Sequence, residues 1–194
     1  MKTSQRTFLL VLLITANIHL LLAQWIPANG PYGGIVSCLA VSGTNLFAGT
    51  DGGGVSLSTN NGTSWTAVNN GLTNTFVISL AVSGTNLFAG TSGGVFLSTN
   101  NGTSWTAVNT GLTDSVVAAF AVSGTNLFAG TDGGGVFLST NNGSSWTAVN
   151  AGLTNSHVFA FAASGTNLYG SPPVMAAAAN GDSAVGGDTS DSTA

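Results

Sequence analysis

The chain has 194 residues, of which 43% are hydrophobic and only 4% are charged, and its formal net charge is -4 at pH 7. Lys2 and Arg6 are its only basic residues, and it contains no glutamate. Because nucleic-acid binding depends on lysine and arginine contacts to phosphates, this composition excludes a nucleic-acid partner.

The N-terminus has the layout of a secretory signal peptide. Both basic residues precede an apolar run over residues 7–23, and we place cleavage after Ala23. A retained membrane anchor is the alternative, but the run is short for a span and is interrupted by two polar residues. We therefore expect residues 1–23 to be a signal peptide and the protein to be secreted, periplasmic or at the cell surface.

Residues 24–170 contain an internal repeat. The octapeptide STNNGTSW at 58–65 returns at 98–105 and, with one threonine changed to serine, at 139–146. Its tryptophans, Trp65, Trp105 and Trp146, are therefore 40 and 41 residues apart. Such a period, with four short strand-like runs per unit, is typical of a radial or stacked repeat array.

The octapeptide predicts a tight hairpin. Its Asn-Gly pair suits a type I′ turn, because both central residues of that turn need positive φ. The motif resembles the Asp-box of bacterial neuraminidase-type repeats, S-x-D-x-G-x-[ST]-W, with asparagine where that family has aspartate. An amide oxygen still accepts the turn hydrogen bond, so we expect the same hairpin. The motif residues are Ser58, Asn60, Gly62, Trp65, Ser98, Asn100, Gly102, Trp105, Ser139, Asn141, Gly143 and Trp146.

Each unit predicts four short antiparallel strands, at 76–82, 87–91, 95–99 and 105–109 in the second unit. Coils of a parallel β-helix are usually shorter, so we predict an all-β fold, a β-propeller of four-stranded blades of about 40 residues. Residues 25–170 also resemble the repeats of photosystem II stability/assembly factor-like and neuraminidase-like propellers. That resemblance implies the propeller fold.

The repeats do not add up to a whole number of blades, so the sequence does not decide how the ring closes. Residues 25–34 align with 65–74, so the repeats begin on the last strand of a unit, and a fourth unit begins at His157 but lacks its third strand. About 3.5 blades are thus present. Residues 171–194 have too little apolar content to order themselves, and we expect a disordered tail there. A fragment of a longer propeller, a four-blade ring and a homo-oligomer that exchanges terminal strands all remain possible.

Most of the candidate chemistry has a structural explanation. The tryptophans could stack on sugars, but their fixed place in a turn motif favours core packing. Cys38 shares its repeat position with small residues, so a buried slot is favoured over a reactive thiol. His157 with Asp114 and a serine would make a triad on paper, but His157 replaces apolar residues of other units. Scattered aspartates lack the dense oxygen ligands of a calcium loop, and we expect no metal and no cofactor.

The resemblance does not extend to catalysis. Neuraminidases of that family use an arginine cluster and a Tyr/Glu pair, which this composition cannot supply. We therefore expect no enzymatic activity.

The loops that differ between repeats are the candidate binding site. Alternating strand directions place the Gly-rich turns and the connections between units at one end of the sheets, where variable polar loops on a rigid scaffold usually carry recognition. The predicted function is a secreted or surface binding scaffold for a protein or a glycan. A carbohydrate-binding module and a truncated part of a glycosidase-like propeller are the alternatives. The candidate binding residues are Asp51, Ser92, Asp132, Asn74, Asp114 and Asn155.

Overall fold

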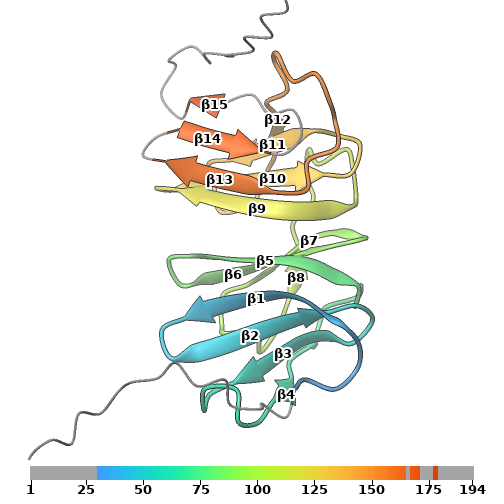
Figure 1. Ribbon diagram of the computed structural model, residues 1–194, viewed down its shortest axis with the longest axis vertical. Helices are drawn as coiled ribbons and strands as arrows, with labels where there is room; N and C mark the ends of the chain where they lie inside the picture. Colours follow the sequence, from blue (N-terminus) through green and yellow to red (C-terminus); the bar gives the residue numbers. More distant parts are fainter. Residues whose placement is uncertain (1–29, 165–166, 171–176, 179–194) are drawn as a thin grey trace, which may run out of the picture.

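A computed structural model describes residues 30–164, 167–170 and 177–178 of the chain. They form four antiparallel sheets in chain order (Figure 1). The first sheet consists of β1 (Val36–Ser42), β2 (Asn45–Thr50), β3 (Gly54–Ser58) and β4 (Thr66–Ala67), and the second of β5 (Val77–Ser83), β6 (Asn86–Thr91), β7 (Gly94–Ser98) and β8 (Thr106–Ala107). The third sheet consists of β9 (Val117–Ser123), β10 (Asn126–Thr131), β11 (Val136–Ser139) and β12 (Thr147–Ala148), and the fourth of β13 (Phe161–Ser164), β14 (Asn167–Gly170) and β15 (Ala177–Ala178).

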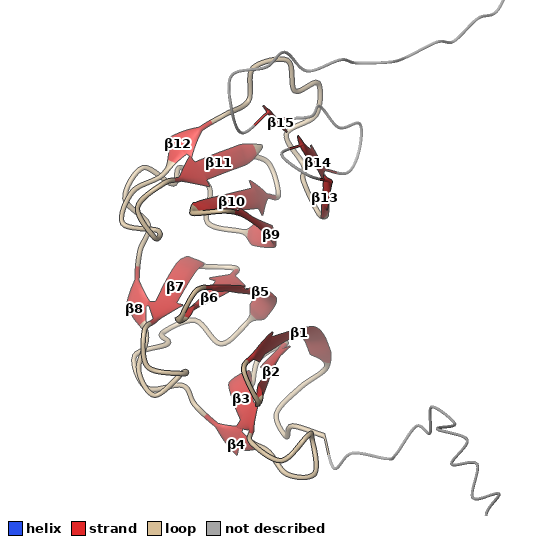
Figure 2. Ribbon diagram, turned by 90° about the vertical axis from the view of Figure 1, so that its left-hand side faces the viewer, coloured by secondary structure: helices blue, strands red, loops and turns tan. Residues whose placement is uncertain are grey.

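The four sheets lie face to face along an open arc, with β1, β5, β9 and β13 on its concave side (Figure 2). Within each sheet the strands follow their sequence order, so each blade is a simple meander. This is an incomplete propeller of about four blades, and it confirms the predicted all-β class. The described residues include no helix long and apolar enough to cross a membrane.

The fourth strand of each of the first three blades is shorter than the sequence predicts. The second sheet ends in the two-residue β8 instead of a strand over 105–109. The reason is that the flanking groups bond elsewhere: Trp105 N donates to Asn70 O, 2.8 Å away at the edge of the first sheet. On the other side, Asn109 Oδ1 accepts a hydrogen bond of 2.7 Å from Val95 N.

The Asn-Gly hairpins have the predicted backbone. In the first hairpin, φ is 56° at Asn61 and 84° at Gly62, and Thr63 N donates to Asn60 O at 3.2 Å. Asn60 Oδ1 accepts hydrogen bonds from Ser58 Oγ and Ser64 N, both 2.9 Å long. The second and third hairpins repeat these contacts.

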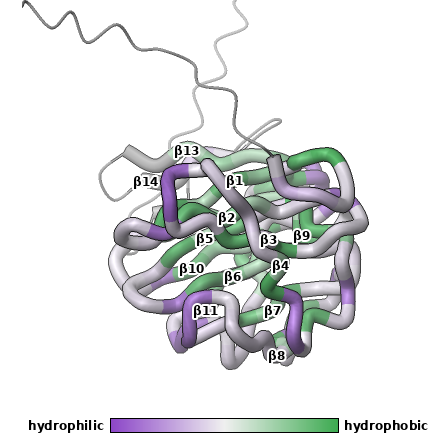
Figure 3. The backbone as a smooth tube through the Cα atoms, turned by 90° about the horizontal axis from the view of Figure 1, so that it is seen from below, coloured by the Kyte–Doolittle hydropathy of each residue, from purple (hydrophilic) through white to green (hydrophobic). Residues whose placement is uncertain are grey.

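Apolar side chains fill each boundary between neighbouring sheets. Figure 3 colours the backbone by hydropathy and shows hydrophobic stretches, in green, along the strands. Phe47 of the first sheet is fully buried against the second, and burial of such a side chain stabilises the fold by about 2–3 kcal/mol. Trp105 and Trp146 are each only 4% exposed, as expected for core residues. Trp65 is half-buried.

The last blade has a third strand that the sequence analysis assigned to the tail. Ala177–Ala178, within the predicted disordered stretch, pair with β14 as β15, because the β14 edge offers main-chain groups that another strand can bond. The predicted signal peptide at 1–23, the Trp25-led strand and the remainder of the tail lie outside the described residues.

Candidate functional site

All six candidate binding residues lie at the same end of the sheets. Three come from the Gly-rich turns between the second and third strands, and three from the connections that lead into the next blade. We call this end the variable-loop rim and define it by Asp51, Asn74, Ser92, Asp114, Asp132, Asn155 and the neighbouring His157. Asp51, Ser92 and Asp132, in the Gly-rich turns, are exposed, and so is His157.

The three connection residues have a structural role of their own. Asn74 Oδ1 accepts a hydrogen bond from Phe76 N at 3.1 Å. Asp114 Oδ1 and Asn155 Oδ1 accept the equivalent bonds at 2.9 Å from Val116 N and His157 N. Each is an Asx turn, in which a short polar side chain bonds the backbone two residues ahead. The same side chain thereby fixes the connection and leaves its remaining polar atoms toward the rim.

Two of the Gly-rich turns are tied to the following blade. Gly52 N and Gly54 N both donate to Thr75 O, at 3.1 and 3.0 Å. Gly133 N and Gly135 N donate likewise to Ser156 O, at 3.2 and 2.8 Å. The second turn is one residue shorter, and its side-chain contact is with the connection that precedes its own blade.

That side-chain contact joins Asn74 and Ser92. Asn74 Nδ2 lies 3.2 Å from Ser92 Oγ, and Ser92 Oγ lies 3.3 Å from Asn74 Oδ1. The structure therefore brings one predicted connection residue and one predicted turn residue into direct contact, although sequence analysis could place them only at the same end of the molecule.

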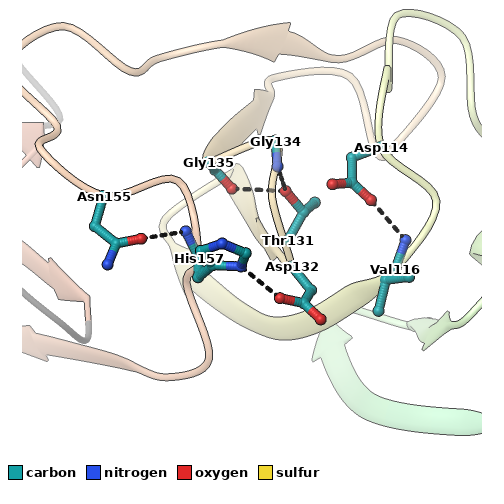
Figure 4. Close-up of polar contacts among 8 residues, drawn as sticks. All are labelled: Asp114, Val116, Thr131, Asp132, Gly134, Gly135, Asn155 and His157. Carbon is teal, nitrogen blue, oxygen red and sulfur yellow. Dashed lines mark hydrogen bonds and ion pairs between the residues drawn. The ribbon is translucent and has the colours of Figure 1, made fainter.

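Asp132 and His157 form the shortest polar side-chain contact of the rim (Figure 4). Asp132 Oδ1 lies 2.6 Å from His157 Nδ1, and both side chains are exposed. The His157 ring also stacks on Phe159, with ring centroids 6.2 Å apart. The histidine thus pairs with Asp132 across a boundary between blades, whereas the triad considered from the sequence joined it to Asp114.

The first blade offers an internal comparison for this pair. Asp51 occupies the repeat position of Asp132 and forms a β-bridge with Phe76, as Asp132 does with His157. The signal for the pairing was therefore present in the sequence: an aspartate turn in one blade and a histidine where the next blade usually has an apolar residue. The displacement between neighbouring sheets, which decides whether these two side chains meet, could not be read from the sequence.

The rim provides hydrogen-bonding and negatively charged groups. Within the described residues, no group of three or more His, Cys, Asp or Glu side chains is placed to hold a metal ion. The arrangement suits contacts with a ligand that donates hydrogen bonds or carries positive charge.

Comparisons with known proteins agree with this architecture. The family model described as the DUF6242 beta propeller domain matches residues 32–188. Among solved structures, an ancestral GH74 enzyme is similar at 27% identity with a TM-score of 0.65, over 79% of this chain and 24% of that one. No curated protein matches the sequence.

Two further structures share the fold at lower identity. The extracellular domain of BT3049 from B. thetaiotaomicron is 14% identical with a TM-score of 0.63, over 84% of this chain and 24% of that one. YCF48 from Cyanidioschyzon merolae is 13% identical with a TM-score of 0.59, over 84% of this chain and 58% of that one. The chain thus spans about a quarter of the length of the ancestral GH74 enzyme.

Proposed function

Because this chain belongs to the family of DUF6242 β-propeller domains, we propose that it is a non-catalytic binding scaffold that contacts its ligand through the variable-loop rim. The observation that carries this proposal is the gathering of all six repeat-variable polar residues at one end of the sheets. Loops held by a rigid scaffold are the usual place for recognition.

The rim combines order with variation, as a recognition surface requires. Asx turns and the glycine contacts to Thr75 and Ser156 hold its backbone. The side chains at its turns nevertheless change from Asp51 to Ser92 to Asp132 along the arc. A ligand that spans several blades would therefore meet a different pattern of groups at each one.

The charges of the rim narrow the class of ligand. Asp51, Asp114 and Asp132 are its charged carboxylates, and the sequence beyond Arg6 contains no lysine or arginine. An anionic ligand would be repelled, whereas a glycan hydroxyl or a basic peptide would find acceptors. The partner in this proposal is a protein or a glycan, and nucleic acid is excluded.

The proposal places the protein outside the cytoplasm and its hairpins in the Asp-box type. The apolar run at 7–23 supports export, and the similar BT3049 domain is extracellular in its own protein. The hairpin contacts of Asn60 support the second assignment, because they have the donors and acceptors that an aspartate would use.

Binding to a glycan array and to a displayed peptide library tests the function. The decisive variant replaces Asp51, Asp114 and Asp132 by asparagine, which retains the Asx turn that Asn74 and Asn155 already make. We expect this variant to fold normally and to lose binding. The matched control replaces Thr44, Thr85 and Thr125 by alanine in the exposed turns at the opposite end of the sheets. Unchanged binding by the aspartate variant would refute the rim as the site.

The GH74 similarity favours a second candidate, a part of a glycoside hydrolase-like propeller. Glycoside hydrolysis usually needs two carboxylates on either side of the scissile bond. Asp114 lies beside the Gly-rich turn that holds Asp132, since a Cβ at Gly133 would lie 3.2 Å from Asp114 Oδ2 (Figure 4). Release of reducing ends from soluble polysaccharides, abolished in Asp114→Asn or Asp132→Asn, would support hydrolysis. Saturable glycan binding without release would support a carbohydrate-binding module.

A further inference from the structure

The first sheet has an apolar face that is covered in the second and third sheets. Leu39 and Val41 on β1 are 59% and 64% exposed. Their repeat counterparts in the second sheet, Leu80 and Val82, pack into the core shared with the first sheet. Phe120 and Val122, at the same positions in the third sheet, pack into the core between the second and third sheets. The β1 face therefore has the residues of a contact between blades.

Trp65 gives an independent indication on the same face. The Nε1 atoms of Trp105 and Trp146 donate to the main-chain oxygens of Val68 and Val108 in the preceding blade, at 2.7 and 2.8 Å. Trp65 Nε1 is also buried, but no described residue accepts a hydrogen bond from it. A buried N–H without an acceptor is costly, and native proteins rarely retain one. In the second and third blades, the acceptor for this atom belongs to the preceding blade.

The other end of the arc has the complementary face. Phe47, Phe88 and Phe128 are each buried by the blade that follows them, and none is more than 2% exposed. Tyr169 on β14 occupies the same repeat position in the fourth sheet, and it is 44% exposed. Among the described residues, no sheet covers the outer face of the first sheet or the outer face of the fourth.

The shape of the arc indicates which molecule covers both of these end faces. The first and last sheets lie at opposite ends of an open curve and do not meet (Figure 2). Propellers close with 4 to 8 blades. Two arcs of about four blades, related by a two-fold axis, would close such a ring through two identical contacts. Each chain would place its last blade on the first blade of the other.

We infer that the β1 face with Leu39, Val41 and Trp65 binds the fourth sheet of a second copy of this chain, and that two chains close one ring. This contact surface is separate from the variable-loop rim.

Sedimentation equilibrium and native mass spectrometry of the full chain test the inference. We expect the mass of two chains for the unmodified protein. The double variant Leu39→Glu/Val41→Glu should have the mass of one chain with an unchanged circular dichroism spectrum, because both positions are exposed in the single chain. Ala107→Glu, at an exposed position of a blade whose faces are both covered, should retain the two-chain mass.

A mixing experiment provides a second test that does not depend on one variant. Tyr169→Asp alters the opposite face and should also give single chains. Mixing it with Leu39→Glu/Val41→Glu restores one of the two contacts, because each variant keeps the face that the other has lost. We expect two-chain species to reappear in the mixture. A one-chain mass for the unmodified protein, open polymers, or two-chain species that survive both variants would overturn the inference.

Discussion

The indole nitrogen of Trp105 donates a hydrogen bond to the main-chain oxygen of Val68, 2.7 Å away, across the boundary between the first and second blades. The main-chain nitrogen of Trp105 makes a second bond across the same boundary, to Asn70 O at 2.8 Å. The tryptophan that follows the hairpin thus ties the second blade to the first, and Trp146 ties the third blade to the second in the same way.

Trp105→Phe should therefore destabilise the fold by more than the loss of ring volume. The substitution removes the indole donor and leaves the Val68 oxygen without its partner, and we expect the free energy of unfolding to fall by about 1–3 kcal/mol. Urea denaturation followed by circular dichroism measures this. Both substitutions are made in the one-chain variant Leu39→Glu/Val41→Glu, where Trp65→Phe is the control because no described residue accepts a hydrogen bond from Trp65 Nε1. Equal losses in the two variants would contradict the assigned role of the bond.

Gly90→Ala should be more damaging than alanine at an open glycine. A Cβ at Gly90 would lie 2.8 Å from Val117 O and Val117 Cγ1, so the second and third blades would be forced apart. We expect a loss of about 1–3 kcal/mol or more. Gly84→Ala is the control: its φ of 60° costs about 1 kcal/mol, but nothing lies within 4 Å of the added atom. Thermal unfolding of both variants distinguishes the contact from the backbone strain.

The sequence predicts the parts of this fold that depend on local chemistry. Positive φ at Asn61 and Gly62 follows from the turn type, and the shared end of Asp51 and Asn74 follows from alternating strand directions. The short β8 was not predictable in this way, because the main-chain nitrogen of Trp105 bonds the preceding sheet instead of its own. The pairing of Asp132 with His157 also depends on the displacement between neighbouring sheets. Contacts within a blade were therefore predictable, whereas contacts between blades were not.

Asn60→Asp should preserve the hairpin and Asn60→Ala should weaken it. The Oδ1 atom of Asn60 accepts bonds from Ser58 Oγ and Ser64 N. A carboxylate retains both as stronger, charge-assisted bonds, so we expect a change between zero and a gain of about 1 kcal/mol. Alanine removes this acceptor together with the Nδ2 donor to Ser64 Oγ, 2.9 Å away, and should cost about 1–2 kcal/mol. Chemical denaturation of both variants measures these changes in the free energy of unfolding. A larger loss of stability for aspartate than for alanine would argue against the Asp-box type.

The Asp132 and His157 pair should contribute little to stability. Both side chains are exposed, and ion pairs of this kind contribute about 0–1 kcal/mol and weaken with salt. The variants Asp132→Asn, His157→Phe and their combination form a double-mutant cycle, in which phenylalanine reproduces the arrangement of Asp51 and Phe76 in the first blade. Unfolding at low and high salt measures the coupling. A coupling well above 1 kcal/mol would indicate that the pair supports the blade boundary and is not free for ligand contacts.

Stability should decrease at high pH because of Cys38. Burial raises the pKa of its thiol from 9.0 to about 11, and a backbone hydrogen bond at Gly49 offsets part of this effect. Between these two values the unfolded thiol loses its proton while the folded thiol keeps it. The unfolded state then binds fewer protons, and stability falls as pH rises through that interval. Since the side chain is only partly buried, we expect a loss of no more than about 2 kcal/mol.

Cys38→Ala provides the matched comparison, because alanine already occupies the equivalent position 119 in the third blade. Urea denaturation of both proteins at intervals from pH 8 to pH 11 isolates the thiol, since every other titrating group is common to the two and cancels in the difference. The difference should be constant up to pH 9 and should then shrink in favour of the alanine variant. A difference that does not change with pH would mean that the Cys38 thiol titrates alike in the folded and unfolded chains.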